Sequence, residues 1–72
     1  MNKIYFNNEI YNFKAIQSAV LDYSSLAEIT INSANNGWEC SFSACRHDTV
    51  QTIKEFANYC IDLMVSGEND DY

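Results

Sequence analysis

Residues 48–64, DTVQTIKEFANYCIDLM, decide the fold of this chain. Their apolar residues recur at steps of three and four, which places them on one stripe of a helix. Asp48 is a suitable N-cap, Gln51 completes a capping box, and Gly67 is a suitable C-terminal cap. A helix this one-sided has to pack against an apolar surface, which the preceding residues must supply. The stripe consists of Val50, Ile53, Ala57, Cys60, Ile61 and Met64, flanked by Phe56.

The residues just before this helix predict a β-hairpin. Apolar and polar residues alternate over 27–32, as in a strand with one buried face. Asn36-Gly37 is the strongest turn signal of the sequence and favours a two-residue type I′ loop. With that loop the opposed pairs are Asn35 with Trp38, Ser33 with Cys40, Ile31 with Phe42 and Ile29 with Ala44. The apolar residues of both strands then share one face.

The first third of the chain predicts two short strands and a helix. Ile4-Tyr5-Phe6 is a short apolar burst, and Glu9-Ile10-Tyr11 follows it after Asn7-Asn8, which tolerates a tight bend between two short strands. Asn12 is a suitable cap for a helix over 13–24. Its apolar residues have helical spacing: Phe13, Ile16, Ala19, Val20 and Tyr23.

Together these elements predict an α+β fold in the order ββαββα. A small antiparallel sheet of three or four strands carries both helices on one face, so that every apolar stripe is buried. Residues 1–67 form a single domain, and residues 68–72 form an acidic flexible tail. Seventy-two residues are close to the lower limit for an unaided core, so the stability should be modest.

The charge and the apolar content bound the function. Ten acidic and four basic side chains give a net charge of −6. Nucleic acids and anionic membrane surfaces both attract basic patches, so neither is an expected partner. No apolar run is long enough to span a membrane. An odd number of cysteines without a signal peptide fits the reducing cytoplasm better than a disulfide framework.

The residues with reactive side chains do not form a convincing site. Cys40, Cys45, Cys60 and His47 are all zinc-ligand types, but their spacing does not match a structural zinc site. Cys40 and Cys60 fall on the inward faces of the hairpin and the helix, where free cysteine is a small core residue. Cys45 and His47 precede a helix N-terminus, so they are either a reactive pair or ordinary connector residues. We expect no catalytic, cofactor or metal site and no enzymatic activity.

The sequence resembles the HxsD-like family, the small proteins of the His-Xaa-Ser system. The resemblance rests on Ile4-Tyr5-Phe6, on Tyr11 followed by Ala15-Ile16 and Ala19, on Ala27, and on Glu55-Phe56-Ala57-Asn58 with Ile61-Asp62. That family is associated with radical S-adenosylmethionine enzymes that modify a ribosomally made peptide. The resemblance therefore implies an accessory role, such as presenting a precursor peptide or docking to a maturase, and it carries over no catalytic residue.

The expected function is that of a small non-catalytic module that binds a protein or peptide. A small sheet has edge strands whose unpaired backbone groups accept an extended segment, or another copy of the chain in a homodimer. The alternative is an acidic inhibitor, of the type made by phages, that occupies a basic groove on a nuclease. A redox or metal protein that uses the three cysteines is a third reading.

Overall fold

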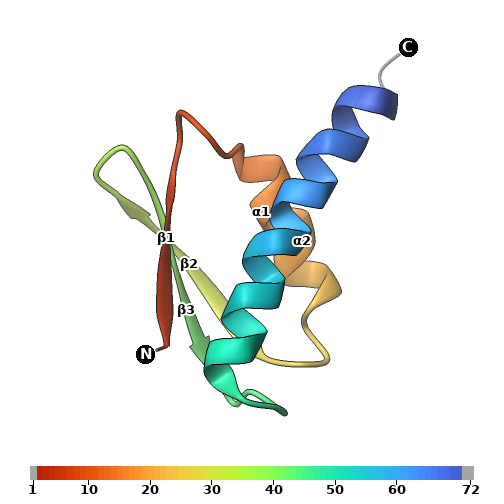
Figure 1. The fold of residues 1–72 in the computed structure, drawn as a ribbon. Helices are drawn as coiled ribbons and strands as arrows, with labels where there is room; N and C mark the ends of the chain where they lie inside the picture. Colours follow the sequence, from red (N-terminus) through yellow and green to blue (C-terminus); the bar gives the residue numbers. More distant parts are fainter. Residues whose placement is uncertain (1, 71–72) are drawn as a thin grey trace.

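The computed structural model describes the backbone of residues 2–70 and the side chains of residues 2–66. The elements are β1 (Lys3–Asn7), α1 (Phe13–Asp22), β2 (Glu28–Ala34), β3 (Gly37–Ser43) and α2 (Thr49–Asp70). The strands form one antiparallel sheet in the order β1-β3-β2. Both helices cover the same face of this sheet (Figure 1). The predicted α+β class is therefore confirmed, with three strands.

The element order is βαββα, so the predicted second strand over 9–11 is wrong. Asn7 causes the difference because it closes a turn instead of a hairpin. Its side-chain Oδ1 accepts from the Glu9 amide at 2.7 Å, and its carbonyl accepts from the amides of Ile10 and Tyr11 at 3.2 and 2.9 Å. With Asn12 already capping α1, no residues remain for a second strand.

The hairpin of β2 and β3 forms, but its loop lies one residue earlier than predicted. Ala34 pairs with Gly37, so the loop is Asn35-Asn36, and Ile31 faces Cys40 instead of Phe42. Only Asn36 of the two loop residues has a left-handed backbone (φ 61°), whereas a type I′ turn needs both. The pairing is thus shifted by two residues, which leaves the paired side chains on their predicted faces. Ala44, which was predicted to face inward opposite Ile29, instead follows the end of β3 and is exposed.

Gly37 is required by close packing. A Cβ atom at this position would lie 2.0 Å from the backbone carbonyl oxygen of Phe6, across the β1–β3 pair. That oxygen belongs to the main chain of a paired strand, so it cannot move aside without breaking the sheet.

The core lies between the sheet and the two helices. Phe56 of α2 is fully buried at its centre, with its ring centroid 5.1 Å from that of Phe42 and 6.0 Å from that of Phe6. The predicted stripe of α2 is therefore rotated. Phe56 is central, whereas Val50 and Ile61 are 43% and 41% exposed. The largest fully buried side chains are Phe6, Phe42, Phe56, Ile16, Cys40 and Cys60.

The helix starts agree with the sequence more closely than the helix ends. Asn12 accepts from the Ala15 amide and Asp48 from the Gln51 amide, so both predicted N-caps are confirmed. The reciprocal half of the capping box is not formed, because the Gln51 side chain donates to Glu55 instead. α1 ends at Asp22, two residues before its predicted end.

α2 continues to Asp70, beyond the cap predicted at Gly67. The side chains of residues 67–70 are not described, and Asp71 and Tyr72, the end of the predicted tail, lie outside the described residues. Over the part of the chain that the structure describes, no helix is long and apolar enough to cross a membrane.

The crowding at Gly37 gives a stability prediction. We expect Gly37→Ala to lower the free energy of unfolding by about 2–3 kcal/mol, because its methyl group collides with the Phe6 carbonyl. Asn36→Gly should leave the stability unchanged or raise it slightly, since Asn36 holds the left-handed position. Urea unfolding followed by circular dichroism measures both. A type I′ loop at 36–37 would give a different result, with Gly37→Asn as well tolerated as Asn36→Gly.

Candidate functional site

The four residues with reactive side chains lie in two places: Cys40 and Cys60 in the core, and Cys45 and His47 on the connection between β3 and α2. Cys40 and Cys60 are fully buried and belong to the same core cluster as Phe6, Phe42 and Phe56. Burial raises the pKa of the Cys40 thiol to about 11. Burial, with a smaller contribution from the nearby Cys40, raises the pKa of Cys60 to about 12. Both are therefore neutral thiols at physiological pH, which suits a packing role.

Cys45 and His47 lie on the connection between β3 and α2. Cys45 is half-buried against the margin of the core, and His47 is exposed. The backbone between them is held by the Arg46 amide, which donates to the Leu26 carbonyl at 2.8 Å. Among the described residues no group of three or more His, Cys, Asp and Glu is arranged to hold a metal ion.

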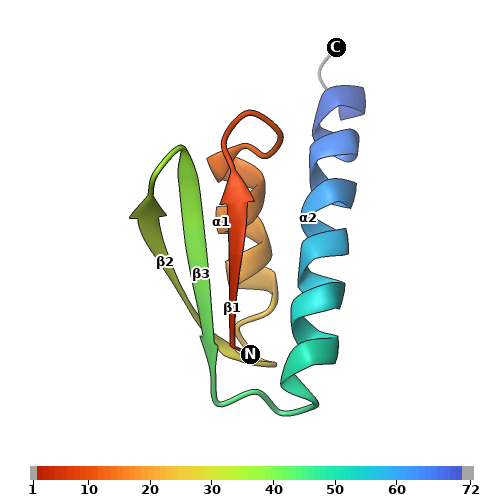
Figure 2. The same ribbon diagram turned by 60° about the vertical axis from the view of Figure 1, so that its left-hand side comes forward.

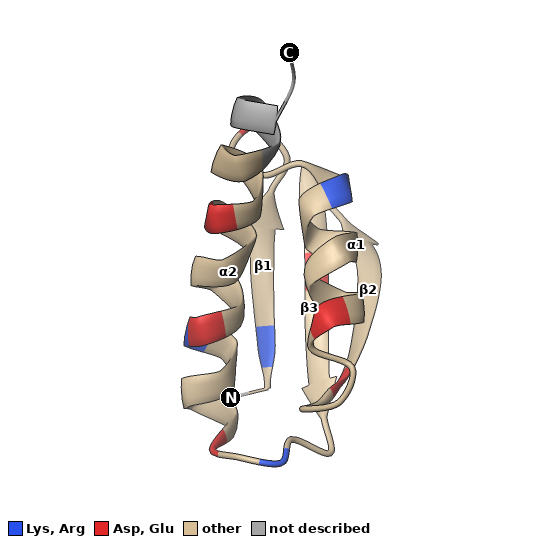
Figure 3. Ribbon diagram, turned by 90° about the vertical axis from the view of Figure 1, so that its right-hand side faces the viewer, with Lys and Arg blue, Asp and Glu red and all other residues tan. Residues whose placement is uncertain are grey.

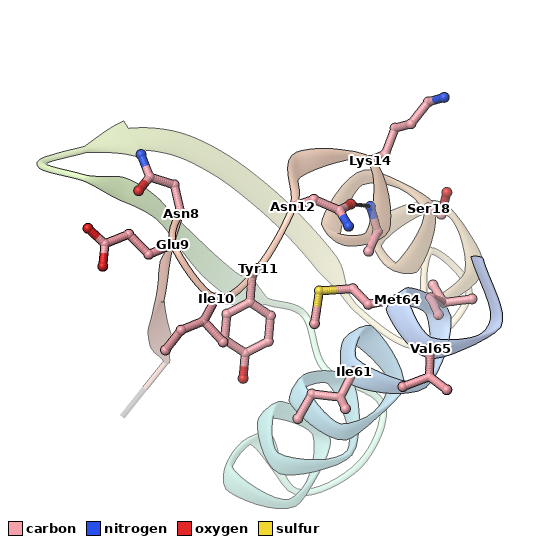
Figure 4. Close-up of a pocket in the computed structure, with 12 residues that line it drawn as sticks. Asn8, Glu9, Ile10, Tyr11, Asn12, Lys14, Ser18, Ile61, Met64 and Val65 are labelled. Carbon is pink, nitrogen blue, oxygen red and sulfur yellow. Dashed lines mark hydrogen bonds between the residues drawn. The ribbon is translucent and has the colours of Figure 1, made fainter. Parts of the chain in front are cut away.

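Two hollows on the surface are candidates for binding. The first is about 770 Å³ and lies between the turn before α1 and the C-terminal half of α2. Figure 4 shows Tyr11 and Met64 facing each other across it, with Ile61 and Val65 on the α2 side and Lys14 pointing outward at the rim. It is wide and mixed in polarity, and none of its lining residues belongs to a strand.

The second hollow is a groove of about 600 Å³ between β1 and α2. Figures 2 and 3 both place β1 beside α2, with β2 at the opposite side of the sheet. From β1 the groove is lined by Lys3, Ile4 and Tyr5; from α2 it is lined by Val50, Ile53, Lys54, Ala57 and Asn58. We call it the β1–α2 groove.

The backbone of β1 offers unpaired hydrogen-bonding groups at this groove. In an antiparallel pair, alternate residues bond to the partner strand and the others point away from it. The Phe42 amide donates to the Asn2 carbonyl at 2.7 Å, and the Asn8 amide donates to the Asn36 carbonyl at 2.8 Å. The even-numbered residues thus bond to β3, and the amides and carbonyls of Lys3 and Tyr5 point outward.

Asn7, the third odd-numbered residue of β1, has only its backbone amide free to bond to an added strand. The Asn7 carbonyl already accepts from the amides of Ile10 and Tyr11. Outside the sheet ladder, no hydrogen bond among the described residues uses the backbone amides or carbonyls of Lys3 and Tyr5, and the alternation within the ladder directs them away from β3. The available edge is therefore short and centred on residues 3–5, where the groove lies.

The groove has an apolar wall on the helix side. Ile53 is buried, Ala57 is half-buried, and Val50 is 43% exposed although it was predicted to lie on the buried stripe. The sequence indicated that an edge strand would bind, but it did not identify β1 or the partial exposure of Val50. That exposure depends on how α2 is rotated about Phe56, which no local pattern in the sequence specifies.

Thiol labelling tests this placement of the cysteines. Treated with iodoacetamide at pH 8, the folded protein should take up one adduct, on Cys45, because burial shields Cys40 and Cys60 and raises their pKa. Peptide mass spectrometry locates the adduct, and the unfolded chain, in which all three cysteines react, serves as the control. Labelling of Cys40 at the rate of Cys45 would contradict the described core.

Three comparisons with known proteins bear on the identity of the chain. No family model, no curated protein and no solved structure matches it. Its function is therefore inferred from its own geometry.

Proposed function

We propose that this protein is a non-catalytic accessory module that binds an extended peptide segment by strand addition to the free edge of β1. The observation that carries the proposal is the coincidence of two features at one place. The outward backbone groups of Lys3 and Tyr5 lie where the β1–α2 groove provides an apolar wall. Backbone bonds supply affinity in this mode of recognition, and pockets for alternate side chains supply specificity.

The bound segment becomes a fourth strand outside β1. Its backbone exchanges up to four hydrogen bonds with Lys3 and Tyr5, each contributing roughly 0.5–1.5 kcal/mol. The segment residue opposite Ile4 faces the helices, because directly opposed residues share a face of the sheet. Its side chain contacts Ile4, Ile53 and Ala57. After the cost of ordering the peptide, the dissociation constant is on the order of 100 μM.

Such weak, reversible binding suits a protein that presents a segment to another enzyme. The resemblance to the HxsD-like family extends the proposal to a specific segment, the precursor peptide of a radical S-adenosylmethionine maturase. In that role the module holds the precursor in an extended form while the maturase acts on it.

The alternative of an acidic nuclease inhibitor has less support. Its basis is the net charge of −6. An inhibitor of that type needs its carboxylates on one face to match a basic groove. The acidic residues with described side chains are spread over the turn before α1, both helices, β2, β3 and the β3–α2 connection: Glu9, Asp22, Glu28, Glu39, Asp48, Glu55 and Asp62.

Proline substitution tests strand addition at β1. Octapeptides are selected from a phage-displayed library against the protein, and their binding is measured by NMR titration of the labelled chain. Tyr5→Pro removes an outward amide but keeps the β1–β3 bonds made by Ile4 and Phe6, so it should weaken binding at least tenfold. Tyr5→Val, which also loses the ring but keeps the amide, should weaken it less than threefold.

Ser33→Pro is the control at the other edge. By the same alternation Ile29, Ile31 and Ser33 point their amides away from β3, and Ser33 is exposed. This variant should bind as the parent does. The proposal fails if no peptide is recovered, if Tyr5→Pro binds as well as Tyr5→Val, or if the amide shifts appear along β2 instead of β1.

A further inference from the structure

The β1–α2 groove carries a charge opposite to that of the whole chain. Two of the four Lys and Arg residues, Lys3 and Lys54, are among the eight residues that line it, and none of the eight is acidic. The chain as a whole has ten acidic residues and a net charge of −6. The lysines of the groove attract the carboxylates of a ligand, whereas the acidic surface around the groove repels them.

The two lysines come from opposite sides of the groove. Lys3 belongs to β1. Lys54 belongs to α2, where it lies one helical turn after Val50 and nearly one turn before Ala57, on the same side of the helix. The apolar side chains of Ile4 and Ile53 belong to the same two walls. A segment in the groove therefore meets apolar side chains and an ammonium group from each wall.

Lys3 is available for a ligand although it has a neighbour of opposite charge. Its Nζ lies 3.9 Å from a carboxylate oxygen of Glu39, and the two side chains are 59% and 41% exposed. Ion pairs with this exposure contribute about 0–1 kcal/mol, so the ammonium readily turns to a second carboxylate. Lys54 is exposed, and no ion pair involving it is found within the described part of the chain.

We propose that the β1–α2 groove selects an acidic, aliphatic segment, with one aliphatic side chain opposite Ile4 and carboxylates that contact Lys3 and Lys54. This inference rests on the strand addition proposed above and specifies its ligand. The residue opposite Lys3 shares the outer face of the sheet with it, and opposed charges in such cross-strand pairs attract. The carboxylate for Lys54 comes from the helix-facing side of the segment.

A second copy of the chain fits this groove less well. Its own β1, KIYFN, contains one lysine and no acidic residue. Two β1 strands paired edge to edge bring two Lys3 and two Lys54 residues together without supplying a carboxylate from the added strand. An acidic peptide supplies that carboxylate, so we commit to it as the occupant.

One pair of synthetic peptides tests the inference. The acetylated and amidated heptapeptides TTVEETT and TTVQQTT differ only in charge, and NMR titration measures their dissociation constants. With the valine opposite Ile4 in an antiparallel pairing, the first glutamate lies opposite Lys3 on the outer face and the second lies on the helix-facing side. We expect TTVEETT to bind about fivefold to tenfold more tightly in 50 mM salt, and the difference to shrink at 500 mM. The double variant Lys3→Gln/Lys54→Gln should lose this preference and bind the two peptides equally.

Lys14→Gln is the matched control, because Lys14 lies on α1 outside the β1–α2 groove. It removes one positive charge and should keep the preference. Equal binding of the two peptides, with amide shifts at Lys3 and Tyr5, overturns the charge selection and leaves strand addition standing. Absence of binding by both peptides and by the selected library overturns both. A preference that survives the double variant, or a concentration-dependent dimer joined through β1 in sedimentation, also overturns the inference.

Discussion

The packing of Phe56 is the interaction on which the rest of the structure depends. Its ring lies edge-on against Phe42 of β3 and Tyr23 at the end of α1, and it is tilted against Phe6 of β1. One side chain of α2 thus contacts residues of two strands and the cap of the other helix. Aromatic pairs of this kind contribute about 0.5–1.5 kcal/mol beyond their buried area. By setting the rotation of α2, Phe56 also decides that Val50 and Lys54 line a groove with β1.

Local sequence patterns predicted both helices, the hairpin and the buried face of the hairpin, but the buried stripe that they predicted for α2 included Val50 and Ile61, which are exposed. Periods of two and of 3.6 residues identify which side chains face inward, and both N-caps have a local hydrogen-bonding cause. The hairpin pairing was missed because a shift by two residues conserves every face, so the alternation of Ile29 and Ile31 fits both registers. The extra strand was predicted because apolar content alone did not reveal how Asn7 closes a turn on itself.

For the candidate site, the sequence predicted only its kind, an edge strand that binds an extended segment, and not which strand forms it. A small open sheet must have edges, and the sequence contains no feature that covers them. Which edge lies next to an apolar wall depends on the order β1-β3-β2, in which the first strand pairs with residues thirty or more positions further along the chain. Pairings over such distances are set by the whole core. The inward placement of Cys40 and Cys60 was visible in the sequence, because it follows from the periods of their own elements.

The unequal attachment of the two outer strands links ligand binding to folding. β2 is joined to β3 by seven residue pairs and a two-residue loop, whereas β1 has five pairs and is held by a distant part of the chain. Of the two outer strands, β1 is therefore the one whose local release leaves the hairpin paired. A segment that adds to β1 binds only the closed form, so it raises the melting temperature as its concentration increases. Occupied and empty molecules should thus differ in their resistance to proteolysis near the N-terminus.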